Sequence, residues 1–179
     1  MNELITYVDY LQKKNADDLA FYPVSAIDKA ISNGHVITCK DNGEFAGYLW
    51  HGPIHPSKSI YIYQACVDYD SRKRHLGWGM VGELIYMGKS SYSLDIKLRC
   101  SSSSESNAFW QAIGFYCTNT TKGGGRRNRD INHWVTDLQS PLMIVDEVIP
   151  STKKKDTSQY ESMRRKGVSM PNRWSRTHY

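Results

Sequence analysis

Four basic residues and two glycines lie together in the stretch from Arg72 to Gly79, which reads Arg-Lys-Arg-His-Leu-Gly-Trp-Gly. An apolar, β-prone run precedes this stretch, and a run with helical character follows it. Glycine removes the side chain where an anion must approach the backbone, and the first turn of a helix presents unpaired N–H groups at the positive end of its dipole. The order of strand, glycines and helix therefore predicts a phosphate site. An ordinary strand-to-helix turn needs glycine too, so a purely structural role stays open.

A second block, Asn107 to Phe115, reads Asn-Ala-Phe-Trp-Gln-Ala-Ile-Gly-Phe and follows a strand-like segment, Leu94 to Cys100. The two blocks, in this order, resemble two motifs of the GNAT superfamily, the acyl-CoA-dependent N-acyltransferases. One is the loop that holds the pyrophosphate of coenzyme A, and the other is a late helix that enters a strand. The resemblance covers roughly residues 34–138. It implies an α/β GNAT fold, a mixed central β-sheet flanked by helices, with acetyl-CoA as the cosubstrate and an amine that attacks the thioester directly.

The resemblance also implies which residues contact coenzyme A, namely the end of the strand before the loop, the loop itself and the late helix. These positions are Cys66, Val67, Arg72, Arg74, His75, Leu76, Gly77, Trp78, Gly79, Asn107 and Trp110. The superfamily often has a tyrosine, acting as general acid, where this chain has Trp110. An indole N–H is no useful proton donor at neutral pH, so the acid must come from elsewhere. Tyr63 and Tyr116 are the candidate phenols, and water is the alternative.

His51 is the candidate base, because it ends a strand where an acceptor pocket could open; an ordinary hydrogen-bonding role is the alternative. His55 lies four residues further on, but Pro53 and Pro56 exclude the helix that would pair the two histidines around a metal. The four cysteines also lack metal-ligand spacing, so no metal is expected. In the last strand, Asn132 and Trp134 fall on one face that could line the acceptor pocket, with Asn132 as a further catalytic candidate.

Basic residues recur in two later segments. The first is an insertion between the last two strands, Lys122-Gly-Gly-Gly-Arg126-Arg127-Asn-Arg129. It is either a charged loop tip or an acceptor-binding loop for a phosphate-rich substrate, with Arg126, Arg127 and Arg129 as contacts. The second is the C-terminal part, from residue 139 onward, which has eight Lys and Arg and four acidic residues. This segment therefore carries most of the net charge of +5 of the chain. It is a solvated extension or an arm for a polyanion.

The combination of these segments resembles phage-encoded GNAT proteins, some of which, the Mom type, modify DNA bases. Because the glycine motif is retained here, ordinary acetyl-CoA chemistry is expected. A nucleic-acid base is the leading acceptor, reached through the basic hairpin and the C-terminal tail. A protein lysine or a small amine is the alternative within enzymes, and an inactive GNAT scaffold that binds a partner is the alternative outside them.

The periodicity of apolar residues predicts alternating helices and strands. Helices are expected at 2–13, 24–32, 80–89 and 104–113, and strands at 35–39, 45–51, 60–67, 94–100, 115–118 and 131–138. The expected organisation is a GNAT domain over 1–140 and a basic extension over 141–179. The absence of a long apolar run or a signal pattern, together with buried free thiols, predicts a cytoplasmic protein, in the host cytoplasm if it is phage-encoded, with no membrane contact. The oligomeric state is left open.

Overall fold

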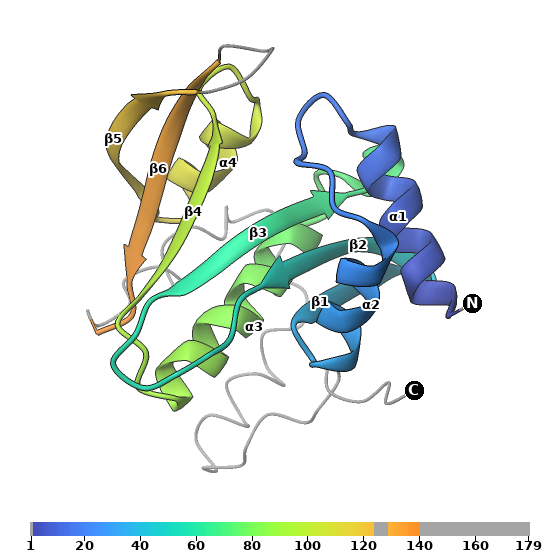
Figure 1. Ribbon diagram of the computed structural model, residues 1–179, viewed down its shortest axis with the longest axis horizontal. Coiled ribbons are helices and arrows are strands. Elements are labelled where there is room, and N and C mark those ends of the chain that lie inside the picture. Colours follow the sequence, from blue (N-terminus) through green and yellow to red (C-terminus); the bar gives the residue numbers. More distant parts are fainter. Residues whose placement is uncertain (1, 124–128, 140–179) are drawn as a thin grey trace, which may run out of the picture. The chain divides into compact units, whose positions relative to one another are not determined.

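The computed structural model describes residues 2–123 and 129–139, and the expected basic extension at 141–179 lies outside this range. Within it, a six-stranded sheet runs in the order β1-β2-β3-β4-β6-β5 and is flanked by α-helices (Figure 1). The strands are β1 (Val36–Asp41), β2 (Glu44–His51), β3 (Ile60–Val67), β4 (Asp95–Ser101), β5 (Tyr116–Lys122) and β6 (Asp130–Asp137). The helices are α1 (Glu3–Lys14), α2 (Val24–Ser32), α3 (Leu76–Ser90) and α4 (Ser106–Ala112), with a 3-10 turn η1 (Tyr69–Ser71).

Neighbouring strands are antiparallel except for β3 and β4, which are parallel and joined by α3. A parallel pair needs a crossover, and α3 supplies it. The mixed α/β class predicted from the sequence is confirmed. Local signals set two of the boundaries. The Asn2 side chain caps α1 by accepting the Leu4 amide at 3.0 Å, and Asn42 and Gly43 both have positive φ in the β1–β2 turn.

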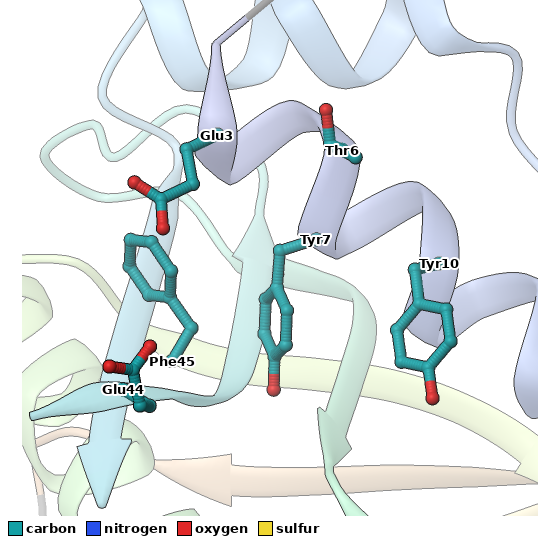
Figure 2. Close-up of a pocket in the computed structure, with 6 residues that line it drawn as sticks. All are labelled: Glu3, Thr6, Tyr7, Tyr10, Glu44 and Phe45. Atoms are coloured by element: carbon teal, nitrogen blue, oxygen red, sulfur yellow. The ribbon is translucent and has the colours of Figure 1, made fainter. Parts of the chain in front are cut away.

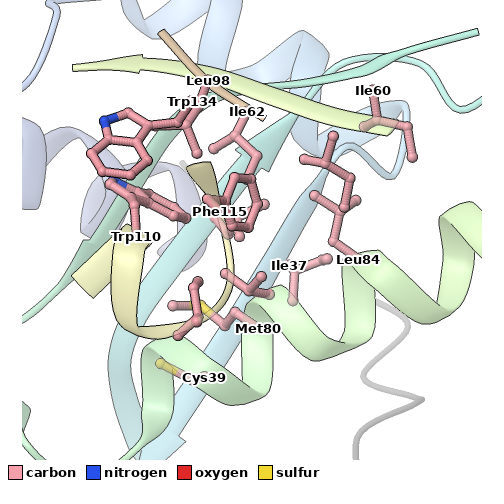
Figure 3. Close-up of a cluster of buried hydrophobic side chains, with 14 of the residues drawn as sticks. Ile37, Cys39, Ile60, Ile62, Met80, Leu84, Leu98, Trp110, Phe115 and Trp134 are labelled. Carbon is pink, nitrogen blue, oxygen red and sulfur yellow. The ribbon is translucent and has the colours of Figure 1, made fainter. Parts of the chain in front are cut away.

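Two apolar layers hold the helices to opposite faces of the sheet. α1 and α2 pack on one face against Tyr48, Trp50 and Cys66 of β2 and β3. α3 and α4 pack on the other face in the larger cluster (Figure 3). The members of this cluster labelled in the figure are Ile37, Cys39, Ile60, Ile62, Met80, Leu84, Leu98, Trp110, Phe115 and Trp134.

α3 approaches the sheet closely at Gly88, which is buried. A Cβ at this position would lie 2.6 Å from the Leu138 side chain and 2.8 Å from that of Ile60. Glycine is therefore required here for packing, because it lets α3 lie close to β3. This close packing places the first turn of α3 beside the end of β3, where the candidate site lies.

Candidate active site

A gap opens between the parallel strands β3 and β4. The two strands pair over three residue positions and the last pair joins Ile62 to Leu98, although both strands continue beyond it. Past Ile62, the backbone edge of β3 that faces β4 therefore has no strand partner within the described part of the chain. An unpaired strand edge inside a sheet offers N–H and C=O groups to an extended ligand.

A β-bulge in β3 coincides with this opening. On the side of β2, Gln64 lies opposite Trp50 and Ile62 lies opposite His51, which leaves Tyr63 as an extra residue. A bulge bends its strand and increases the local twist, so it directs the second half of β3 away from β4. Because one residue is inserted, the side chains after the bulge point to the opposite face of the sheet from the one that strict alternation would give them.

The exchange of faces is visible in the burial of β3. Before the bulge, Ile60 and Ile62 contribute to the α3 and α4 layer. After it, Cys66 packs with α1 and α2, whereas Ala65 and Val67 contact the α3 and α4 layer. Strict alternation would have put Ile62 and Cys66 on the same face, so one inserted residue decides which side chains line the gap.

The backbone groups that face the gap follow from the ladder with β2. The Asp68 amide donates to the Ala46 carbonyl of β2 at 2.8 Å. Backbone groups alternate in direction along an antiparallel strand, so the Cys66 amide also faces β2, while those of Ala65 and Val67 face the gap. The Cys66 amide, for which a coenzyme contact was expected, thus faces β2, and its thiol is buried, with a pKa raised by that burial to about 11. The backbone groups of Val67, the other residue expected there, face the gap together with those of Ala65.

The loop from Arg72 to His75 leads into the head of α3 beside the gap. Lys73 and His75 adopt left-handed conformations with φ of 63° and 60°. A non-glycine residue in this region costs about 1–2 kcal/mol, and such strain gathers at binding sites. The first amide of α3 with a partner inside the helix is that of Gly79, which donates to the His75 carbonyl at 3.1 Å. Within the described residues, the amides of Leu76, Gly77 and Trp78 make no hydrogen bond. Three unpaired amides at the positive end of a 15-residue helix can donate hydrogen bonds to an anion.

The two glycines lie inside the first turn of α3 rather than before it, and neither has positive φ. The turn that precedes the helix is made by Lys73 and His75 instead. A Cβ on Gly77 would lie 3.1 Å from the Phe109 ring, so this glycine makes room for α4. A Cβ on Gly79 would meet no protein atom within 4 Å. Gly79 thus leaves open space beside the unpaired amides.

The arginines of the loop are engaged within the protein. Arg72 donates from Nε to the Val67 carbonyl and from a terminal nitrogen to the Asn15 side chain, both at 3.2 Å. Arg74 forms an ion pair with Asp41 at 2.6 Å. These contacts hold the loop to β3, to the end of α1 and to the β1–β2 hairpin. Lys73 and His75 are exposed, so the Lys73 cation and the His75 imidazole remain for a ligand.

Asn107 does not have a free amide for coenzyme A. Its Oδ1 accepts from the Cys100 thiol at 3.1 Å and from Asn132 Nδ2 and Trp134 Nε1 at 3.0 Å each. Its Nδ2 donates to the carbonyls of residues 101, 102 and 104 at 2.7–3.1 Å. Because the indole can only donate, the orientation of the amide is fixed. Asn107 therefore ties β4, β6 and the start of α4 together, so its side-chain amide is engaged within the protein.

The two tryptophans expected at the site lie in the core. Trp110 is 5% exposed and meets the rings of Phe109 and Phe115 edge-on, at 5.0 and 5.3 Å. Trp134 is 6% exposed, and its indole lies beside that of Trp110 (Figure 3). Both indoles are therefore buried in the protein core, and the coenzyme contact of Trp110 and the acceptor contact of Trp134 stay predictions. The large apolar area of each ring explains the outcome, since burying it contributes more than a surface role would.

His51 is also buried, at 1% exposure. Its Nδ1 lies 2.7 Å from the Gly52 carbonyl, while its Nε2 is buried and has no hydrogen-bond partner among the described residues. Desolvation lowers the pKa of the imidazole, the Gly52 carbonyl opposes this, and His35 adds to the lowering. A base must reach its substrate, so the structure does not support His51 as the base.

The remaining catalytic candidates lie in different places. Tyr63 is the bulge residue, is 46% exposed and meets Trp50 edge-on, and a Cβ added at Gly52 would lie 3.0 Å from its hydroxyl, so its ring lies over the end of β2 on the α1 and α2 side. Tyr116 lies in the edge strand β5, opposite Val135 of β6, two strands from β4. Asn132 donates from its side-chain amide to Asn107 and accepts from Thr120 at 2.8 Å. Of these three residues, Tyr63 alone belongs to β3, the strand whose edge opens.

A buried polar network, which the sequence analysis did not anticipate, holds the α1–α2 loop over β3. Gln64 is 3% exposed; it donates to the Ala20 carbonyl and accepts from the Tyr48 hydroxyl at 2.9 Å. Gln12 is 1% exposed and bonds both backbone groups of Tyr22, at 2.7 and 3.0 Å. A glutamine on the otherwise apolar face of a helix or strand was the sequence signal that could have predicted this network. The hydrogen bonds of Gln12 and Gln64 hold the α1–α2 loop in place, and this loop forms a wall on the α1 and α2 side of the gap.

Arg129 connects this wall to the β5–β6 hairpin by donating to the Asp17 carbonyl at 2.7 Å. The connection spans the two sides of the opening, since the α1–α2 loop lies on β3 and the hairpin extends from β6. The other two predicted acceptor contacts, Arg126 and Arg127, lie outside the described residues.

A separate hollow lies between α1 and the β1–β2 hairpin (Figure 2). Its lining residues are Glu3, Thr6, Tyr7, Tyr10, Glu44 and Phe45. Tyr7 stacks on Phe45 at 5.5 Å between ring centroids, and Lys40 already lies over the Phe45 ring at 4.8 Å. None of the residues expected at the active site lines this hollow.

Metal-binding clusters and membrane-spanning helices are both absent from the described residues. No three or more His, Cys, Asp or Glu side chains in residues 2–123 and 129–139 gather into a group that could hold a metal ion. No helix in the same part of the chain has the length and apolar character needed to cross a bilayer.

The architecture defined by the split β3–β4 pair and the α3 crossover is the GNAT fold. An acetyltransferase assigned to the GNAT family from Desulfovibrio desulfuricans superimposes with a TM-score of 0.64 at 15% identity, covering 77% of this chain and 94% of that one. The ribosomal-protein-S18-alanine N-acetyltransferase from Escherichia coli gives 0.63 at 12% identity over 80% and 94%. An aminoglycoside 6'-N-acetyltransferase complexed with coenzyme A gives 0.63 at 12% over 79% and 94%. No family model and no curated protein matches the sequence itself.

Proposed function

We propose that this protein is an acyl-CoA-dependent N-acyltransferase that uses acetyl-CoA and transfers the acyl group directly to an amine. One observation carries the proposal: the gap beyond the Ile62–Leu98 pair leads to the unpaired amides at the head of α3. A coenzyme diphosphate on these amides would leave its pantetheine arm alongside the free edge of β3. The similarity to GNAT N-acetyltransferase structures, one of them complexed with coenzyme A, supports this.

The residues fit the coenzyme in two respects. Gly79 leaves open space at the helix head, where a side chain would otherwise stand. Lys73 adds an exposed cation and His75 an exposed imidazole beside the head of α3, while Arg72 and Arg74 shape the loop through Val67, Asn15 and Asp41. A phosphate at such a place gains charge-assisted hydrogen bonds from backbone N–H groups.

The transfer step follows from the same edge of β3. The amine nitrogen bonds to the thioester carbon, the C–S bond breaks, and the amine loses a proton while the thiolate gains one. The amides of Ala65 and Val67, which face the gap, would stabilise the oxyanion; removing one such donor typically costs about 10²–10³ in kcat. Tyr63, the exposed phenol of the β3 bulge, is the proposed proton donor. Solvent is the proposed proton acceptor, since His51 is buried.

The acceptor would enter from the α1 and α2 side, between the α1–α2 loop and the β5–β6 hairpin, and the leading class is a nucleic-acid base. The arginines of the hairpin and the net charge of +5 support this class. A nucleic-acid acceptor would fit a phage-encoded enzyme that acts in the host cytoplasm. A protein amine or a small amine is the second candidate, favoured by the named substrates of the ribosomal-protein and aminoglycoside acetyltransferases of the same fold. A scaffold without turnover is the third.

Two measurements test the proposal. Calorimetry with acetyl-CoA tests the coenzyme site, and release of free thiol in the presence of DNA, tRNA, a lysine peptide or a polyamine tests transfer and acceptor class. We expect micromolar coenzyme binding, and with nucleic acid a rate that falls as salt rises from 50 to 200 mM. A folded protein that takes up no acetyl-CoA would refute the enzyme. Coenzyme binding without thiol release from any acceptor class would favour the scaffold.

A further inference from the structure

Among residues 2–123 and 129–139, no helix covers one face of the second half of the sheet. In β4 and β6, Leu98 and Trp134 face the α3 and α4 layer. Side chains alternate along a strand, so Lys97, Arg99 and His133 lie on the opposite face. α1 and α2 do not cover them, because these helices pack on β1, β2 and β3 (Figure 1). This uncovered face of β4, β6 and β5 is on the same side of the sheet as the proposed acceptor opening.

Tyrosines stand at both ends of one row across this face. Register pairs join Tyr61 to Lys97, Lys97 to Val135 and Val135 to Tyr116. The row spans four strands, which puts the outer two about 14 Å apart at the usual strand spacing. Tyr61 is 49% exposed and Tyr116 is 55% exposed. Exposed aromatic rings on an open sheet face form a surface on which bases can stack.

On this face, acidic side chains lie toward one end of the strands and basic side chains toward the other. Asp95 and Asp137 lie opposite each other at the end away from the gap, and Asp95 pairs with Lys97 at 3.3 Å. One row beyond the tyrosines, Arg99 lies opposite His133. Arg99 is exposed and forms no ion pair with any residue of 2–123 or 129–139. The cationic side of the tyrosine row therefore faces the gap, and the acidic side faces away from it.

We infer that single-stranded nucleic acid docks on this uncovered face, with bases stacked on Tyr61 and Tyr116 and phosphates toward Arg99 and His133. Adjacent rows lie two residues apart, about 6.7 Å, which is comparable to the span from a base to its phosphate. A strand held in this way would run toward Arg99 and the opening, bringing a base to the thioester. The inference rests on the proposed function for this last step alone, because docking itself needs no coenzyme.

The test uses the full chain and a fluorescein-labelled 15-mer of thymidylate, with dissociation constants from anisotropy at 50 and 200 mM salt. Each of Tyr61→Ala and Tyr116→Ala should weaken binding roughly tenfold, within the range typical for loss of one stacked base. Arg99→Gln should weaken it several-fold and lower the salt slope by about one. Tyr86→Ala is the matched tyrosine control, since Tyr86 is 73% exposed on α3, and Lys29→Gln on α2 is the matched charge control.

Photocrosslinking of the unaltered protein to a 5-iodouracil 15-mer gives a second readout that no folding defect can disturb. Adducts on peptides with Tyr61 or Tyr116 are expected. Equal affinity of the unaltered chain and the tyrosine variants, or adducts confined to residues 141–179, would overturn the inference by assigning binding to the basic extension. A concentration-dependent dimer that Tyr61→Ala dissociates would also overturn it, with a second copy as the occupant. Acetyl-CoA calorimetry on the same variants should be unchanged, so failure here is separable from failure of the enzyme proposal.

Discussion

Replacing Gly79 with leucine should remove coenzyme A binding while leaving the fold intact. The position lies in the first turn of α3, and an added Cβ would meet no protein atom within 4 Å. A leucine side chain therefore strains nothing in the protein itself. It occupies the space beside the unpaired amides of Leu76, Gly77 and Trp78, where the diphosphate is proposed to bind.

The substitution should raise the stability of the fold and lower the affinity for acetyl-CoA. Glycine in an exposed helix is about 0.8–1.0 kcal/mol less favourable than alanine, and leucine is close to alanine, so the variant should be more stable by roughly that amount. For a domain of this size, the expected rise in Tm is about 2–4 °C. Loss of one charge-assisted hydrogen bond costs about 1.5–3 kcal/mol, or roughly 10- to 150-fold in affinity. A side chain that blocks two amides should weaken acetyl-CoA binding beyond the calorimetric range.

Gly82 supplies the matched control. It lies on the same helix, is exposed, and likewise has no atom within 4 Å of an added Cβ. Its amide lies beyond the first turn and is bonded within the helix. Gly82→Leu should raise Tm to the same extent and leave the dissociation constant of acetyl-CoA within about twofold. If Gly79→Leu melts higher and still binds acetyl-CoA like the unaltered protein, the diphosphate does not lie at the head of α3 and the proposed site is wrong.

Three further changes probe the interior. The pKa of His51 is lowered in the folded state, so the unfolded state binds more protons below about pH 6.5, and stability should fall as the pH drops below that value; His51→Leu should flatten this dependence in urea titrations between pH 7 and 5. An equal slope in the variant would assign the acid sensitivity to other groups. Asn107→Ala leaves the Trp134 indole and three carbonyls without their partner, so we expect a loss of at least about 3 kcal/mol in the free energy of unfolding, at about 1–3 kcal/mol per buried group; a loss below 1 kcal/mol would show that water replaces the amide. Gly88→Ala should destabilise by about 1–3 kcal/mol through overpacking, measured by thermal melting, and an unchanged Tm would mean that α3 can lift from the sheet.

Local sequence signals fixed most of the secondary structure. The Asn42–Gly43 turn, the apolar stripe of α1 and the β-prone run of β3 are short-range patterns, and the structure has these elements within a residue or two of the expected bounds. The phosphate-binding stretch was predicted for the same reason, because strand, glycine and helix follow one another directly in the chain. Two bounds differ by more: α3 begins at Leu76, before the glycines rather than after them, and β5 continues to Lys122, four residues beyond its expected end.

The roles of individual side chains depended on contacts between distant segments. Trp110, Trp134 and Asn107 carry groups that could serve a substrate, yet packing of α4 against β6 buries the rings and saturates the amide. His51 lost its predicted role in the same way, since its strand runs into a buried corner beside His35. Whether a polar or aromatic group is free is a property of its neighbours, which the linear sequence does not name.

The sequence by itself determined the class of fold and the place of the proposed anion site, since both depend on residues close together in the chain. Only the tertiary structure decided where the sheet opens, because the bulge at Tyr63 is defined by pairing between β2 and β3 and not by the residues of β3 alone. That single inserted residue turns Ala65 and Val67 toward the gap and sets the uncovered face of β4, β6 and β5 beside it. Strand register is a relation between two segments, so its consequences become visible only once the chain has folded.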